Sequence, residues 1–130
     1  MQGRLPLPAS GRLLARFNEP RQIGNLRWKG IFLAGREGQP VQAVFGGRVV
    51  YAEWLRGFGL LLILDHGDGY MTLYGHNQSL AKSVGDWVEG GETIATVGTT
   101  GDPLRPGVYF EVRHHGAPAD PLRWCVARAP

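Results

Sequence analysis

The 130-residue chain has a single cysteine, Cys125, which excludes an internal disulfide and a cysteine-rich zinc site. It also has no long apolar run, because the longest, Leu60–Leu64, has only the length of a strand. Like charges are not clustered, since the basic residues are scattered and the net charge is only +3. The composition therefore excludes a disulfide-stabilised scaffold and a membrane-spanning helix, and it does not favour nucleic-acid binding.

Several catalytic motifs are missing as well. No serine lies in a G-x-S-x-G turn, and Gly98–Gly101 lacks the Lys-Ser/Thr pair of a phosphate-binding loop. The histidines His66, His76, His114 and His115 form neither H-E-x-x-H nor H-x-H. If the adjacent His114 and His115 continue a strand, their side chains point to opposite faces. The residues alone therefore predict no catalytic group, no metal and no cofactor.

Glycine is abundant, and its distribution indicates many short strands joined by tight turns. Twenty glycines punctuate β-branched and aromatic runs along the chain. The candidate strands are Gln42–Val44, Arg48–Glu53, Gly59–Asp65, Tyr70–Tyr74, Thr93–Val97 and Val108–Arg113. Asp65–Gly69 is expected to form a hairpin loop, and Asn77–Val84 a loop with one helical turn. We therefore predict an all-β domain with antiparallel sheets and little helix.

The chain divides into a leader and one domain. Residues 1–26 are Pro- and Gly-rich at their start, and we expect an irregular leader packed on the domain formed by residues 27–130. Cys125 follows Trp124 and is expected to be packed rather than reactive. Trp54, Trp87 and Trp124 are also assigned to packing.

Short motifs follow one another in order over about three quarters of the chain. They span Gly38–Ala43, Gly46–Val50, Gly57–Leu60, Asp65–His76, Val84–Ala95, Val97–Gly101 and Val108–Glu111. Together they resemble the LytM-like, or lysostaphin-type, peptidoglycan endopeptidase domain. The resemblance implies that family's antiparallel β fold with an open groove. His66 matches a common family histidine that is not a zinc ligand.

The departures from the family pattern carry the functional information. Family enzymes hold zinc with the His and Asp of H-x-x-x-D and with the second His of H-x-H. The matching positions here are Trp28, Phe32 and Tyr109, and the first, catalytic His of H-x-H is Gly107. Only His76 is left of the catalytic set. Because indole and phenyl groups do not bind metals and a neutral phenol binds them poorly, the resemblance implies a domain without zinc and without hydrolytic activity.

Within the family, the chain resembles the EnvC-type activators of cell-division amidases in Gram-negative bacteria. The segments Arg27–Gly30, Gly57–Leu60, Thr72–Gln78 and Val108–Arg113 carry this resemblance. It implies a periplasmic domain whose former substrate groove binds a zinc N-acetylmuramoyl-L-alanine amidase and displaces its inhibitory helix. It also implies upstream control by a membrane division complex through segments outside this chain, which would then be a C-terminal effector domain. Peptidoglycan is a second candidate ligand.

The resemblance places a partner-binding groove at the replaced positions. An apolar cleft with a charged rim is typical of a site for an amphipathic helix. The expected groove residues are Trp28, Lys29, Phe32, Phe58, Leu61, Tyr74, His76, Tyr109 and Arg113.

Alternative interpretations stay open at this point. Trp28 and Phe32 are also explained as core residues, Tyr74 and Tyr109 as strand residues with solvated hydroxyls, and Arg113 as a surface charge. A passive peptidoglycan-binding module and a zinc endopeptidase with atypical ligands are the competing functions.

Overall fold

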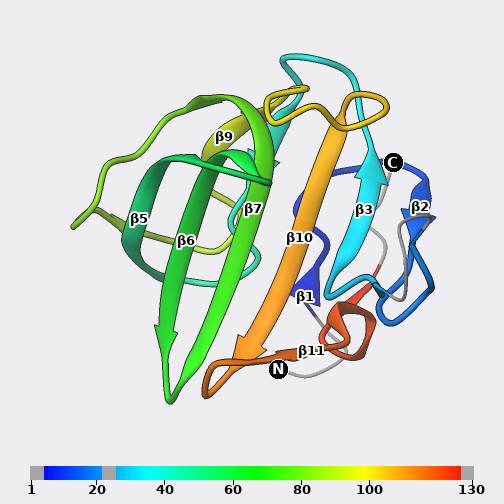
Figure 1. Ribbon diagram of the computed structural model, residues 1–130. Helices are drawn as coiled ribbons and strands as arrows, with labels where there is room; N and C mark the ends of the chain where they lie inside the picture. Colours follow the sequence, from blue (N-terminus) through cyan, green and yellow to red (C-terminus); the bar gives the residue numbers. More distant parts are fainter. Residues whose placement is uncertain (1–4, 22–25, 127–130) are drawn as a thin grey trace.

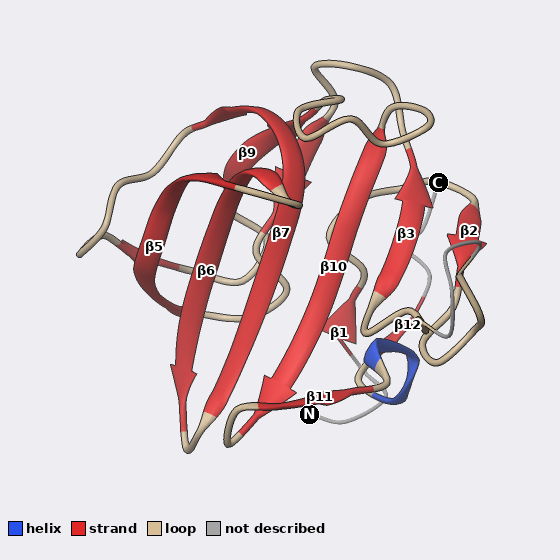
Figure 2. Cartoon of the chain, viewed as in Figure 1, coloured by secondary structure: helices blue, strands red, loops and turns tan. Residues whose placement is uncertain are grey.

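The computed structural model describes residues 5–21 and 26–126, which form strands and a single short 3-10 helix, η1. The strands are β1 (Leu5–Pro6), β2 (Leu13–Ala15), β3 (Ile31–Ala34), β4 (Pro40–Gln42), β5 (Gly47–Leu55), β6 (Gly59–Gly67), β7 (Tyr70–Leu80), β8 (Trp87–Val88), β9 (Thr93–Val97), β10 (Gly107–His114), β11 (Ala117–Ala119) and β12 (Cys125–Val126), with η1 at Pro121–Arg123. The predicted all-β class with little helix is confirmed (Figure 2).

One antiparallel sheet organises the molecule. Its main path has the order β2-β3-β10-β7-β6-β5-β8, and β5, β6, β7, β10 and β3 lie side by side in Figure 1. The far end of β7 leaves this path and pairs with β9, which in turn pairs with β4. These strands lie behind the main path and cover part of it (Figure 1).

The main core fills the space between the sheet and this second layer. Successive side chains of β10 point to opposite faces of the sheet, and Val108, Phe110 and Val112 lie in the core. Tyr109 belongs to a smaller apolar cluster with Phe32, on the opposite side of the sheet. The sheet therefore has a fully covered back and a front that is covered only in part.

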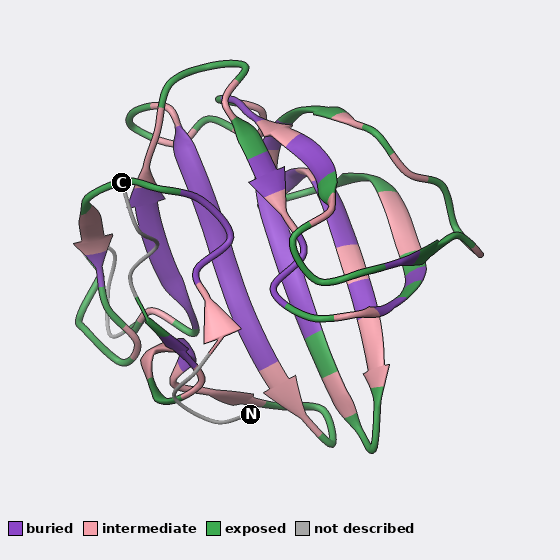
Figure 3. Ribbon diagram, turned by 180° about the vertical axis from the view of Figure 1, so that it is seen from behind, coloured by how far each residue is buried: buried purple, intermediate pink, exposed green. Residues whose placement is uncertain are grey.

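The N-terminal segment contributes to both sides of the sheet. Leu7 and Ala9 are buried in the main core, and β1 pairs in parallel with β12 near the other end of the chain (Figure 3). Strand β2 pairs with β3 at the edge of the main sheet. Residues 5–15 thus contain two short strands and pack on the rest of the domain.

Two sequence expectations about the core and one about β7 have a clear outcome. Cys125 is buried, as predicted. Trp54 and Trp87 are 55% and 75% exposed, so their assignment to packing is wrong. Strand β7 continues to Leu80, so the expected loop with a helical turn at Asn77–Val84 is also wrong, because pairing with β9 extends the strand.

No helix in the described part of the chain is long and apolar enough to cross a membrane.

Candidate functional site

Four rings meet on the front of the sheet at the positions where the sequence suggested a lost metal site. Trp28 lies 6.4 Å from Phe32 and 6.0 Å from Tyr109 between ring centroids. The imidazole of His76 lies 6.1 Å from Phe32 and 6.4 Å from Tyr109. Phe32 and Tyr109 are buried, whereas Trp28 and His76 are partly exposed. The sheet therefore carries a compact aromatic cluster here.

Strand pairing explains why these rings meet. Tyr109 on β10 pairs with Phe32 on β3 on one side and with Gly75 on β7 on the other. His76 follows Gly75 at a β-bulge, where two β7 residues face the single residue Leu61 of β6. Its backbone has φ of 65°, a left-handed conformation, and its N–H donates to the Phe58 carbonyl at 2.7 Å. The bulge redirects the His76 side chain towards the cluster.

An open cleft with a volume of about 800 Å³ lies above this cluster. Its apolar lining includes Leu14, Ala15, Trp28, Phe32 and Leu104. Its charged lining consists of Glu19, Arg21, Asp102 and Arg105. An apolar floor with a mixed charged rim is the surface that an amphipathic segment requires.

One wall of the cleft is a hairpin-like excursion between β2 and β3. Backbone hydrogen bonds link Asn18 to Trp28, Trp28 to Glu19, and Arg21 to Leu26. They hold the guanidinium of Arg21 3.9 Å from the centroid of the Trp28 ring, in cation–π geometry. Arg21 thus places a positive charge over the aromatic cluster.

The opposite wall is the loop between β9 and β10. A backbone bridge between Gly98 and Gly107 closes the loop at its base. Thr100 anchors it, since its hydroxyl donates to the Asn77 carbonyl at 2.6 Å and accepts from the Leu60 N–H at 3.0 Å. At the tip, Leu104 is 98% exposed. Leu104 therefore adds exposed apolar surface to the lining of the cleft.

His76 is suited to hydrogen bonding and not to metal chemistry. Its Nδ1 lies 2.7 Å from the Thr100 carbonyl oxygen, which only accepts, so Nδ1 carries the proton. Burial lowers the pKa of His76, and the charge of Arg21 lowers it further, while the Thr100 hydrogen bond opposes them. The ring is therefore neutral at pH 7, and its Nε2 is an acceptor.

Tyr109, Glu111 and Arg113 form a hydrogen-bonded network along β10. The Tyr109 hydroxyl donates to Glu111 Oε2 at 2.6 Å, and Arg113 Nε donates to Glu111 Oε1 at 2.7 Å. Burial and the negative charge of Glu111 hold the pKa of Tyr109 well above its ordinary value. Tyr109 is consequently a neutral donor whose proton is committed to Glu111.

The structure brings together only part of the predicted groove. Trp28, Phe32 and His76 line the cleft, and Tyr109 and Phe58 pack directly beside them, 5.7 Å apart between centroids. Lys29 is exposed next to Trp28, and Arg113 is held by Glu111 farther along β10. These residues stay candidates for partner contacts.

Two predicted groove residues lie elsewhere. Tyr74 is fully buried in the main core, where Thr72 Oγ1 and the Val44 N–H bond to its hydroxyl. It pairs with Phe110, whose side chain points to the back, so Tyr74 cannot share a face with Tyr109. Leu61 is also fully buried, so its side chain offers no surface to a partner. For both residues, the expectation of a cleft-lining side chain is wrong.

Other cleft residues were not expected from the sequence. They include Leu14, Glu19, Arg21, Asp102, Leu104 and Arg105. Leu104 had a usable signal, because an isolated leucine between Pro103 and Arg105 in a turn-rich loop has no strand to pack it. Arg21 had no such signal in the sequence, because its position over Trp28 depends on the tertiary fold of the segment between β2 and β3.

The residues at the site do not fit the zinc ion of the enzymes that the sequence resembles. A catalytic zinc site needs about three protein ligands. The cluster offers one imidazole, His76, beside an indole, a phenyl ring and a phenol whose proton is shared with Glu111. Within residues 5–21 and 26–126, three or more His, Cys, Asp or Glu side chains do not gather in a metal-binding arrangement.

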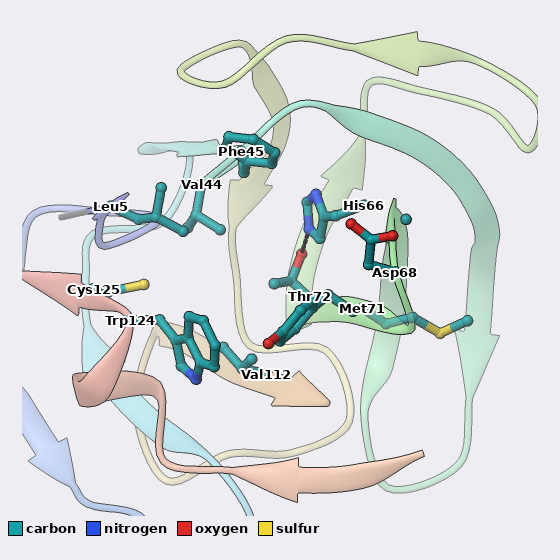
Figure 4. Close-up of a pocket in the computed structure, with 12 residues that line it drawn as sticks. Leu5, Val44, Phe45, His66, Asp68, Met71, Thr72, Val112, Trp124 and Cys125 are labelled. Carbon is teal, nitrogen blue, oxygen red and sulfur yellow. Dashed lines mark hydrogen bonds between the residues drawn. The ribbon is translucent and has the colours of Figure 1, made fainter. Parts of the chain in front are cut away.

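A second, smaller cavity of about 230 Å³ lies on the back of the sheet (Figure 4). Its lining is mostly apolar and includes Val44, Val112, Trp124 and Cys125. Burial raises the pKa of the Cys125 thiol to about 12, so the thiolate is not formed at neutral pH. The cavity therefore contains no reactive group of this type, and the front cleft is the better candidate site.

Comparison with known proteins identifies the class. Residues 26–121 match the sequence model of peptidase family M23, and the chain belongs to this family. It is 46% identical over 117 residues to the murein hydrolase activator EnvC of Escherichia coli (strain K12), covering 90% of this chain and 28% of that protein. It is 38% identical over 122 residues to the murein hydrolase activator NlpD of the same strain, covering 93% and 31%. The chain thus spans about a third or less of these relatives.

Solved structures agree on the fold. The catalytic domain of the antimicrobial peptidase lysostaphin from Staphylococcus simulans is 27% identical, with a TM-score of 0.75, covering 83% of this chain and 86% of that one. A zinc-containing peptidase from Vibrio cholerae gives a TM-score of 0.85 at 23% identity, covering 99% of this chain and 41% of that one. The second likeness concerns the fold alone.

Proposed function

We propose that this chain is a non-catalytic activator of a periplasmic zinc N-acetylmuramoyl-L-alanine amidase. The open cleft binds the regulatory helix of the amidase, removes it from that enzyme's active site and so permits septal peptidoglycan cleavage during daughter-cell separation. A membrane division complex controls this step through segments outside the chain. The observation that carries the proposal is the aromatic cluster of Trp28, Phe32 and Tyr109, which stands at the former ligand positions under an accessible cleft.

The cleft chemistry supports a protein ligand. Leu104 and Trp28 offer apolar surface, Arg21 offers positive charge at the rim, and Lys29 is exposed next to Trp28. Aromatic and arginine side chains dominate the binding energy of many protein interfaces. The murein hydrolase activators named among the relatives support a role in switching on another enzyme.

The test is dye release from labelled peptidoglycan by a division amidase, with the chain, without it, and by the chain alone. We expect stimulation of the amidase and no release by the chain alone. Elemental analysis should find less than about one zinc ion per ten chains, far below the one zinc ion per chain of a structural site. Arg21→Glu and Leu104→Asp should reduce stimulation about tenfold or more. Val84→Asp, a matched change at an exposed site outside the cleft, should not. Release by the chain alone would show it to be an enzyme.

A passive peptidoglycan-binding role has one observation in its favour. Trp54 and Trp87 expose large indole surfaces outside the cleft, and Arg48 lies over the Trp87 ring at 5.9 Å. Such a module would sediment with purified sacculi without changing amidase activity. Sacculus binding that disappears in a Trp54→Ala/Trp87→Ala double variant, together with unchanged amidase rates, would support this second function.

A further inference from the structure

Glu111 is a buried acidic residue to which neither the family resemblance nor the proposed mechanism assigns a role. Its side chain is only 2% exposed. Burying a carboxylate is costly unless hydrogen bonds compensate for the lost hydration. Here each oxygen has one donor, with Oε2 accepting from the Tyr109 hydroxyl and Oε1 from Arg113 Nε.

The surroundings of Glu111 connect three parts of the site. Tyr109, Glu111 and Arg113 alternate along β10 and share its front face. Gly30, which follows Trp28 and Lys29, packs against the Glu111 side chain, because a Cβ atom on Gly30 would lie only 2.8 Å from Glu111 Cγ. Glu111 therefore contacts the aromatic cluster, the arginine and the segment that carries Trp28 and Lys29.

The geometry of Arg113 shows what this network presents to solvent. A guanidinium has five N–H donors, and the contact with Glu111 uses Nε. The Arg113 side chain is 34% exposed, so part of it is open to solvent, in contrast to the buried carboxylate that it contacts through Nε. Terminal guanidinium nitrogens bind carboxylates in a two-bond geometry.

We propose that Glu111 is a positioning residue, whose carboxylate holds Tyr109 and Arg113 in one arrangement so that Arg113 presents its terminal nitrogens to an acidic side chain of the bound helix. This inference rests on the proposed function for the identity of the partner. The ordering of Arg113 by Glu111 is a property of the chain itself. The two parts can therefore be tested separately.

The variant Glu111→Gln separates positioning from packing. Glutamine has nearly the same shape, but its single side-chain oxygen replaces two charged acceptors. Glu89→Gln is the matched control, since Glu89 is exposed and lies outside the cleft lining. Thermal unfolding of each variant shows whether it is folded at the assay temperature.

The first measurement needs no partner. In a ¹⁵N NMR spectrum, we expect a resolved, slowly exchanging Nε–H signal from Arg113 in the wild type and in Glu89→Gln. This signal should shift and exchange faster in Glu111→Gln. An unchanged Arg113 signal in folded Glu111→Gln would overturn the positioning role.

The second measurement is a double-mutant cycle for binding to the amidase. Glu111→Gln should weaken binding about tenfold, and Arg113→Ala at least as much. If Glu111 acts through Arg113, adding Glu111→Gln to Arg113→Ala should cause no further loss. Full additivity of the two losses would contradict the proposal. Failure of the wild type to bind any amidase would instead contradict the proposed function and the partner half of this inference, while the NMR signal would still decide whether Glu111 orders Arg113.

Discussion

At the scale of single residues, burial favours the neutral form of the His66 imidazole, which lies outside the cleft. Its Nδ1 lies 2.8 Å from the Gly46 carbonyl oxygen and its Nε2 lies 2.6 Å from Thr72 Oγ1. Burial lowers its pKa, although the Gly46 hydrogen bond and the charge of Asp65 oppose this. His66 therefore links β6 to the turn before β5 and to β7 as a neutral ring.

We predict that this arrangement makes stability sensitive to mild acid. Because the folded-state pKa of His66 lies below the ordinary value of 6.5, the unfolded chain binds the proton first as the pH falls. The stabilisation is complete above pH 6.5 and is lost below it, by up to about 1.4 kcal/mol per pH unit. Urea unfolding at pH 7.5 and pH 5.5 measures the loss. His66→Gln should reduce the pH dependence of the unfolding free energy.

A second residue-scale prediction concerns the stability of the Glu111 network. Arg113→Ala leaves the buried Glu111 carboxylate with Tyr109 as its remaining donor, which should cost about 1–3 kcal/mol of unfolding free energy. Adding Glu111→Gln should recover part of this loss, because the neutral amide is cheaper to bury. Chemical denaturation of the two single variants and the double variant tests this. A double variant that is less stable than both single variants would contradict the explanation.

Part of this residue-scale arrangement could be predicted from the sequence. Alternation along Tyr109–Arg113 correctly places Tyr109, Glu111 and Arg113 on one face. The same rule, combined with the register of β7, excludes Tyr74 from that face. The register could not be derived, however, because the bulge at His76 inserts a residue that no local pattern announces.

At the scale of elements, two loops rather than strands shape the cleft. The loop between β9 and β10 approaches the start of β6 so closely that glycine is required there. A Cβ atom on Gly59, which has φ of 68°, would overlap Thr100. Gly57 also has a positive φ, 89°, but apart from its chain neighbours no residue has an atom within 4 Å of its Cβ position.

This contrast gives a matched pair of variants. Gly57→Ala should cost about 1 kcal/mol, the strain of a left-handed backbone conformation. Gly59→Ala adds the collision with Thr100, and we expect a total of about 2–4 kcal/mol together with displacement of the loop that carries Leu104. Urea denaturation and NMR shifts of residues 99–106 measure both effects. Equal losses for the two variants would contradict the close approach.

The longer strands β5, β6, β7, β9 and β10 were predicted, whereas most of their ends and the shorter strands, among them β3 with Phe32, were not. Thr93–Val97 is a strand with the predicted bounds, and Asp65–Gly69 contains the turn of the expected hairpin. Strand β7 runs past its predicted end because its second half pairs with β9, a contact far along the chain. Turn residues are marked by local composition, whereas strand length depends on such distant partners.

At the scale of the whole molecule, the two faces of the sheet have different roles. The back carries the main core, to which Leu7, Ala9 and Cys125 contribute from near the two ends of the chain, and Figure 3 shows the segment after β1 lying across this side. The front keeps a small aromatic cluster under an open cleft. The order of the motifs in the sequence predicted the fold and the position of this cleft. The residues that form the walls of the cleft could not be predicted, because they lie in loops whose positions depend on tertiary contacts.

The central claim is that this cleft is a docking site for a helix. The most direct measurement is the fluorescence anisotropy of a labelled peptide with the sequence of an amidase regulatory helix, titrated with the wild type, Arg21→Glu, Leu104→Asp and Val84→Asp. We predict equal binding to the wild type and to Val84→Asp, and binding weaker by about tenfold or more to the two cleft variants. Equal affinity for all four chains would contradict the claim.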